Sequence, residues 1–243
     1  MAAPKKALNN DVNTKQAAKK TPAKVKVARR SNAERTAETR DKIIKAAIEN
    51  IHEAGYAGTS LNTVAARAGV SKGANQHHFP TKAELMLAVA DYALKLHVKI
   101  RGEIFLRYKP GTERISHTAE ASWEIINHPS YVALIEIMMA TRNDPDLNEG
   151  FQPLRDLIQS ELERGERAFC RDFNVEHNEL IETLIRTHVT AMRGIAIGLM
   201  FKPDRKSFRE ELDMMQTYER LMTQVIIEQF GSKNKKSRKK NNA

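Results

Sequence analysis

The stretch "SLNTVAARAGVSKGANQHHFP", residues 60–80, decides how the chain around it folds. Ser60 and Ser71 each stand where their side chains can cap a short helix. Gly69 lies between these two helices, and glycine tolerates the positive φ that a tight turn needs. Pro80 ends the second helix, because the residue before a proline disfavours helical angles. Two short helices around such a turn form a helix-turn-helix, whose second helix can enter the major groove of DNA.

Helical patterns continue through the body of the chain, between residues 33 and 230. Residues 36–54 carry apolar side chains at i, i+3, i+4 and i+7 spacing, which indicates one buried face of a helix. Further helices are expected over about residues 72–78, 82–108, 112–127, 129–142, 147–171, 176–201 and 207–230. No alternating strand pattern of useful length interrupts them. The sequence therefore predicts an all-α fold, with an N-terminal three-helix helix-turn-helix domain followed by a larger C-terminal helical bundle.

The composition indicates a soluble body between two basic tails. The chain has 243 residues, of which 41% are hydrophobic, and a single cysteine, which excludes an intramolecular disulfide. Its formal net charge of +10 is uneven, because residues 1–30 carry +8, residues 231–243 carry +6 and the body carries −4. Polar basic tails bury too little surface to fold, so residues 1–32 and 231–243 are expected to be disordered. The sequence shows neither a membrane-spanning run nor a secretory signal, and we expect a cytoplasmic protein.

The segment from residue 39 to residue 85 resembles the DNA-binding domain of the TetR-type bacterial transcriptional regulators. Four motifs fall at the spacing of that family: Ala54-Gly55-Tyr56, Gly58-Thr59-Ser60, Ala68-Gly69-Val70-Ser71-Lys72-Gly73 and His78-Phe79-Pro80-Thr81-Lys82. The resemblance implies a DNA-binding domain over residues 33–82 and a ligand-binding and dimerisation domain over residues 83–230. It also implies that the last two expected helices pair with their copies in a homodimer.

The same resemblance implies which residues meet DNA. The residues expected at base edges are Lys72, Gly73, Ala74 and His77, and those expected at phosphates are Ser60, Asn62, Gln76, His78 and Lys82, with Ser71 capping the recognition helix. Asn75 and Gln76 depart from the family, which usually has an apolar residue and a tyrosine there. Because asparagine can pair bidentately with adenine, Asn75 is a further candidate for a base contact. His77 and His78 point about 100° apart on a helix and cannot chelate one ion well, so no metal site and no cofactor are expected.

Aromatic and methionine side chains in the C-terminal region can line an adaptable cavity for a small molecule, since methionine fills irregular shapes. The candidate ligand-binding residues are Phe105, Trp123, Tyr131, Met138 and Met139. Ordinary core packing is the alternative explanation for these residues, and the sequence leaves both open. The apolar positions expected at the homodimer interface are Leu184, Met192, Ile195 and Leu199 on one helix, and Met214, Leu221, Met222, Val225 and Ile226 on the other.

Together these features predict a ligand-responsive, sequence-specific DNA-binding transcriptional regulator. The resemblance implies a repressor that binds a palindromic operator on double-stranded DNA as a homodimer and is released by an unidentified small molecule. The alternative is a non-specific, nucleoid-associated protein whose Lys-rich tails coat DNA. An α-helical enzyme ranks last, since the sequence has no Walker-type loop, paired metal ligands or nucleophile constellation.

Overall fold

A computed structural model describes residues 31–201 and 208–231, and the elements within these ranges are helices, which confirms the predicted all-α fold. The N-terminal helices are α1 (Asn32–Gly58), α2 (Leu61–Ala68), α3 (Lys72–His78) and α4 (Lys82–Phe105). The remaining elements are α5 (Thr112–Ile115), α6 (Thr118–Ile126), α7 (Pro129–Ala140), α8 (Pro145–Gly150), α9 (Gln152–Phe173), α10 (Glu179–Phe201), α11 (Arg209–Ile226) and a π-helical end, η1 (Ile227–Gly231). Residues 1–30 and 232–243, which hold nearly all of the two predicted tails, lie outside the described residues.

The first helix begins at a reciprocal cap and is interrupted near its end. The Ser31 hydroxyl accepts the Glu34 amide at 3.1 Å, and the Glu34 carboxylate accepts the Ser31 amide at 2.7 Å. The predicted apolar face is buried, with Ile44, Ala47, Ile48 and Ile51 in the core. Gly55 has φ 73° and ψ 171°, so the helix is broken there before its last residues end at Gly58.

The two short helices form the predicted helix-turn-helix. Ser60 caps α2 by accepting the Thr63 amide at 3.1 Å, and Ser71 caps α3 by accepting the Ala74 amide at 3.1 Å. Gly69 ends α2 in the left-handed region, with φ 66°. These three local features end α2 and begin α3 at the residues that the sequence predicts.

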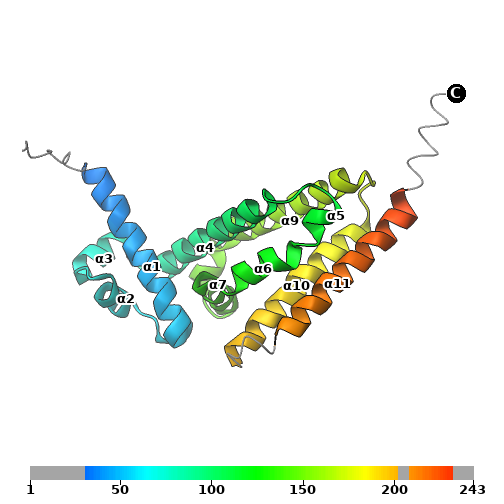
Figure 1. Cartoon of the computed structure of the whole chain (residues 1–243). Helices are drawn as coiled ribbons and strands as arrows, with labels where there is room; N and C mark the ends of the chain where they lie inside the picture. The colour runs from blue at the N-terminus through cyan, green and yellow to red at the C-terminus, as the bar shows by residue number, and fades with distance from the viewer. Residues whose placement is uncertain (1–30, 202–207, 232–243) are drawn as a thin grey trace, which may run out of the picture.

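The largest apolar cluster joins both halves of the chain. It contains buried residues of α1, α2, α4, α7, α8 and α9, and the contact between α1 and α7 is the most extensive between any two elements. The predicted domain boundary at residue 82 falls at the start of α4. The apolar cluster contains residues from both sides of this boundary. In Figure 1, α1 to α3 lie at one end of the molecule and α10 and α11 run side by side at the other.

Two of the predicted helices are divided in the structure. Residues 112–127 form α5 and α6. Between them, the side chains of Ser116 and His117 bond to the carbonyls of Thr112 and Glu113, a contact that competes with regular helical bonding. Residues 147–171 are divided near Phe151, where α9 begins with Pro153 in its first turn. Proline has no amide hydrogen to continue the preceding helix. No described helix combines the length and the apolar character that a membrane span requires.

Candidate nucleic-acid interface and ligand region

The recognition helix α3 presents a polar outer surface. Ser71, Lys72, Gly73, Gln76 and His77 are exposed, while Ala74 and His78 are half-buried. Phe79, directly after the helix, is buried in the main core and anchors its C-terminal end. The structure thus brings the predicted base-edge residues together on one outward surface of a short, capped helix.

Asn75 faces the opposite way, and its predicted base contact is wrong. The residue is 1% exposed, and its side-chain amide donates to the Leu61 carbonyl at 2.7 Å. Its Oδ1 atom is buried with no hydrogen-bond partner among the described residues. The Asn75 side chain thus packs against α2. Asn75 therefore positions α3 rather than meeting DNA.

Three candidates for phosphate contact lie beside the recognition helix and differ in exposure and in the hydrogen bonds that they already make. Asn62 is exposed in the first turn of α2, whereas Ser60 is half-buried and engaged as the cap of that helix. The ammonium group of Lys82 donates to the Tyr56 carbonyl at 2.7 Å and lies 4.1 Å from the centre of the Tyr56 ring. Burial lowers the pKa of Lys82. A phosphate contact for Lys82 stays a prediction, and its ammonium group already has a partner in the protein.

The two adjacent histidines differ in environment. Burial lowers the pKa of His78, and the charges of His77 and Arg40 lower it further. The Arg40 guanidinium lies 4.8 Å from the centre of the Phe79 ring. Arg40 therefore adds an exposed cation beside the recognition helix. No pattern in the sequence indicates this role for Arg40, because α1 and the end of α3 are far apart in the chain. Among the described residues, no three His, Cys, Asp or Glu side chains are grouped to hold a metal ion.

The five candidate ligand-binding residues do not share one cavity lining. Trp123 and Tyr131 pack together against the cluster formed by α6, α7, α10 and α11, while Met138 packs against the main core. Met139 is 60% exposed, so its predicted place in a cavity is wrong. Adjacent residues of α7 point to different sides of the helix, which separates Met139 from Met138. Phe105 is half-buried at the end of α4.

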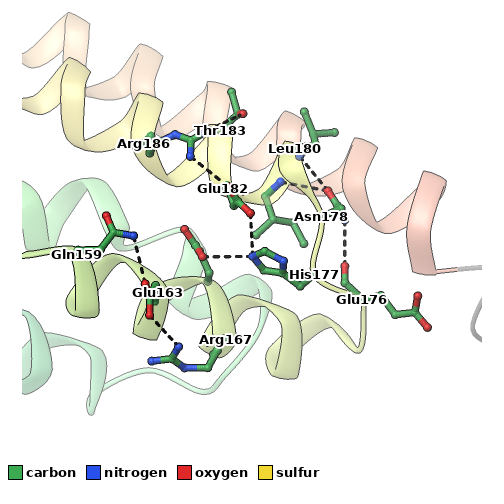
Figure 2. Close-up of polar contacts among 12 residues, drawn as sticks. Gln159, Glu163, Arg167, Glu176, His177, Asn178, Leu180, Glu182, Thr183 and Arg186 are labelled. Carbon is green, nitrogen blue, oxygen red and sulfur yellow. Dashed lines mark hydrogen bonds and ion pairs between the residues drawn. The ribbon is translucent and has the colours of Figure 1, made fainter. Parts of the chain in front are cut away.

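A polar hollow of about 430 Å³ lies between α9 and α10. Figure 2 shows the imidazole of His177 directed toward the carboxylate of Glu182. Its Nε2 atom lies 3.4 Å from Glu182 Oε1 and 3.3 Å from Glu166 Oε2. The lining residues are Gln159, Leu162, Glu163, Glu166, Arg167, His177, Glu182 and Arg186. The sequence does not indicate this hollow, because Glu163, Glu166 and Arg167 follow the pattern of an ordinary solvated helix face.

A second polar contact joins three helices of the same region. Ser122 Oγ on α6 lies 2.7 Å from His188 Nε2 on α10, and His188 Nδ1 contacts a carboxylate oxygen of Glu219 on α11. The other carboxylate oxygen of Glu219 and the hydroxyl of Thr223 are buried with no hydrogen-bond partner in the described ranges. These groups lie between the apolar clusters of the C-terminal half.

An outward recognition helix, held by a glycine turn and two serine caps, defines a helix-turn-helix DNA-binding protein. The family described as bacterial regulatory proteins, tetR family, matches residues 43–89, which span most of α1, the turn and the start of α4. The chain carries the DNA-binding segment of this family, and it is similar to transcriptional regulators rather than to enzymes.

Similarity to known regulators extends beyond the matched segment. The HTH-type transcriptional regulator CymR of Pseudomonas putida is 28% identical over 180 residues, which cover 74% of this chain and 88% of CymR. A transcriptional regulator of Rhodococcus sp. Rha1 has the same fold, with a TM-score of 0.60, 19% identity, and coverage of 79% of this chain and 97% of that one. The multidrug binding protein EbrR, solved with imidazole, gives a TM-score of 0.51 at 22% identity, with coverage of 77% and 94%.

Proposed function

We propose that this regulator is a repressor that binds a palindromic operator as a homodimer and is released by a small molecule. The observation that carries the proposal is a set of exposed apolar side chains on α10 and α11. These two helices run side by side at the end of the molecule opposite the helix-turn-helix (Figure 1). Helical periodicity places three of these side chains on one side of α10 and three on one side of α11. We call this set the α10–α11 face, and it consists of Ile197, Met200, Phe201, Met214, Leu221 and Val225. Phe201 is 82% exposed and Met214 is 68% exposed. Exposed apolar groups gathered in this way are typical of a surface that a protein partner covers.

On α10, the residues proposed for dimerisation differ from those that the sequence pattern predicts. Leu184 and Met192 are buried inside the protomer, and Ile195 and Leu199 pack against the same apolar cluster as Met192. On α11, Met222 and Ile226 likewise belong to the protomer core. Helical periodicity alone does not separate a core face from an interface face, because both are apolar. Met214, Leu221 and Val225 remain available to a second copy.

A two-fold dimer suits DNA because duplex DNA is itself a two-fold object. Two recognition helices related by the dimer axis can enter successive major grooves about 34–36 Å apart. In this proposal Lys72, Gly73, Ala74 and His77 approach base edges, while Asn62, Gln76, His78 and Arg40 approach phosphates. Ser60, Ser71 and Lys82 lie at the edges of this surface. The division at residue 82 into a DNA-binding and a ligand-binding part belongs to the same proposal.

An effector is proposed to bind in the C-terminal part of the chain, which runs from α4 to α11. Trp123 and Tyr131 provide apolar surface there, and the unpaired groups of Glu219 and Thr223 provide hydrogen-bonding capacity. The solved structure of EbrR with imidazole supports a small-molecule effector by analogy of fold. Release requires that the effector binds more tightly to the state that cannot span the operator.

The competing function is a non-specific DNA coat formed by the basic tails. It predicts equal affinity for all duplexes and a steep salt dependence that weakens when residues 1–30 are deleted. The proposed regulator instead retains its preference for one sequence after that deletion. Competition between a selected duplex and random duplex therefore separates the two functions.

The dimer is tested by measuring the mass of the full-length protein by sedimentation, together with operator affinity. Leu221→Glu places a charge in the α10–α11 face and is expected to yield monomers whose operator affinity falls at least about 100-fold. Met139→Glu is the matched control, since Met139 is equally exposed on α7. Its mass and affinity should equal those of the unmodified protein. Finding monomers in the unmodified protein at micromolar concentration, or dimers in Leu221→Glu, contradicts the proposal.

A further inference from the structure

Four polar side chains form a layer in the C-terminal part, where α6, α10 and α11 contact one another. Ser122 on α6 has its Oγ atom 2.7 Å from Nε2 of His188 on α10. The Nδ1 atom of the same imidazole contacts a carboxylate oxygen of Glu219 on α11. Thr223 follows Glu219 by one helical turn and is buried with it. We define Ser122, His188, Glu219 and Thr223 as the polar layer.

The polar layer interrupts an apolar surface of α10. His188 stands four residues after Leu184 and four residues before Met192, which belong to two different apolar clusters. Residues four apart lie on the same side of a helix, so all three side chains face the interior of the protomer. Regular core packing would favour an apolar residue at position 188. The polar groups therefore lie among apolar side chains rather than in solvent.

Two oxygen atoms of the layer lack a hydrogen-bond partner among the described residues, namely Glu219 Oε2 and Thr223 Oγ1. Both residues are 4% exposed. The two nitrogens of His188 already contact Ser122 and the other oxygen of Glu219, so the imidazole does not serve Oε2. A buried carboxylate oxygen without a donor is strongly unfavourable. The layer thus contains a buried acceptor that a bound donor group would satisfy.

A cationic donor satisfies this acceptor best. In the part of the chain that the structure describes, Glu219 forms an ion pair with His188 but with no lysine or arginine. Arg193, also on α10, is hydrogen-bonded to Tyr131 instead. Hydrogen bonds from a charged N–H group to a carboxylate are stronger than neutral ones. An ammonium group carries enough N–H bonds to reach both Glu219 and Thr223, whereas an anionic ligand would bring like charge to the carboxylate.

The surroundings of the layer suit the apolar part of such a ligand. Trp123 follows Ser122 directly on α6 and packs against the cluster that contains Met192. Tyr131 packs against the same cluster. Aromatic rings provide apolar surface and also attract cations to their faces. An amine attached to an apolar or aromatic group therefore matches both the acceptors and their neighbours.

We propose that the polar layer is a binding site for an organic ammonium ion, with the Glu219 carboxylate and the Thr223 hydroxyl as its acceptors. This inference rests on the proposed function and names the chemical class of the effector. His188 is a positioning residue, because its Nδ1 atom holds one oxygen of Glu219 and leaves the other for the ligand. Ser122 in turn fixes the orientation of the imidazole.

Matched small molecules test the chemical class directly. The probes are phenylalkylamines with one to four methylene groups, each compared with the alcohol and the carboxylate of equal chain length. At pH 7.5 the amines are cations and the carboxylates are anions. Trp123 is the single tryptophan of the chain, so fluorescence titration of the full-length protein reports binding beside Ser122. At least one amine is expected to bind about 10-fold or more tightly than its matched alcohol and carboxylate.

Two variants and a control locate the binding. Glu219→Gln keeps the size of the side chain but removes its charge, and should weaken binding of the best amine about 10-fold or more while changing alcohol affinity less than about threefold. Glu211→Gln is the control, because Glu211 is an exposed carboxylate on the same helix. It should bind like the unmodified protein. Thr223→Val removes one acceptor, should weaken amine binding about threefold or more, and covers the case in which Glu219→Gln fails to fold.

The outcomes separate this inference from the proposed function. Binding of none of the amines, preference for the carboxylates, or amine affinity that is unchanged in the folded variants overturns the inference. Selection of an operator by the unmodified protein then leaves the proposed function standing. Amine binding that depends on Glu219 but leaves operator affinity unchanged supports the ammonium site and contradicts release by this class of compound.

Discussion

The buried imidazole of His97 makes the stability of the C-terminal part depend on pH. His97 lies on α4 with its Nε2 2.9 Å from Ser130 Oγ and its ring 5.4 Å from the ring of Tyr131. Burial lowers the pKa of His97 from 6.5 to about 3, with smaller contributions from the charges of His128 and Arg101. The folded state therefore keeps His97 neutral at pH values where the unfolded chain protonates it.

The sign and size of the effect follow from linkage. At pH 7.5 His97 is neutral in both states and contributes no pH dependence. As the pH falls below 6.5, the unfolded state binds the proton and the free energy of unfolding decreases. At pH 4.5 the loss from this one group is about 3 kcal/mol.

The variant His97→Gln isolates this contribution, because glutamine is polar but does not titrate. Urea unfolding of both proteins, followed by far-UV circular dichroism at one protein concentration, gives the free energy of unfolding at pH 7.5 and pH 4.5. The stability advantage of the unmodified protein over the variant should shrink by about 3 kcal/mol between these pH values. A difference that stays constant would show that His97 titrates alike in both states and would refute the reasoning.

Three substitutions test the assignments around the recognition helix. Lys72→Ala should lower the ratio of operator to random-DNA affinity about 10-fold or more while weakening random-DNA binding much less, as measured by fluorescence anisotropy; an equal loss on both duplexes contradicts a base contact. Asn75→Leu should leave operator affinity within about threefold and the melting temperature unchanged or higher, because it removes a buried unpaired oxygen; a large affinity loss in a stable variant would restore Asn75 as a base contact. Lys82→Met should leave the salt dependence of DNA binding unchanged if the ammonium group serves Tyr56, whereas a phosphate contact predicts a slope smaller by about 0.9 in log–log form.

The features predictable from the sequence were those decided within a few residues. The caps at Ser60 and Ser71 and the turn at Gly69 depend only on local backbone geometry, so the helix-turn-helix was correctly predicted. The inward orientation of Asn75 was missed, because a seven-residue helix shows too little periodicity to reveal which side faces α2. The exposure of Met139 was also not predictable. α7 carries apolar residues on nearly all sides, so its sequence does not indicate which side is buried.

Contacts between distant segments were not predictable. The Tyr56 amide donates to Glu136, which lies 80 residues further along the chain. In the sequence, Gly55 indicated only the end of a helix. His177 meets Glu166 and Glu182 because α9 and α10 fold back on each other, which no spacing in either helix reveals. On α10, the apolar residues that close the protomer core could not be separated by pattern from those left for a partner.

Selection of bound sequences from a random pool of double-stranded DNA tests the central claim most directly. That claim is that residues 72–78 face outward and bind DNA, and that a symmetric homodimer presents two such helices to one operator. The expected result is one enriched motif made of two inverted half-sites, with centres about one helical turn or a multiple of it apart. Enrichment of no motif, or of a single unrepeated half-site, would contradict it.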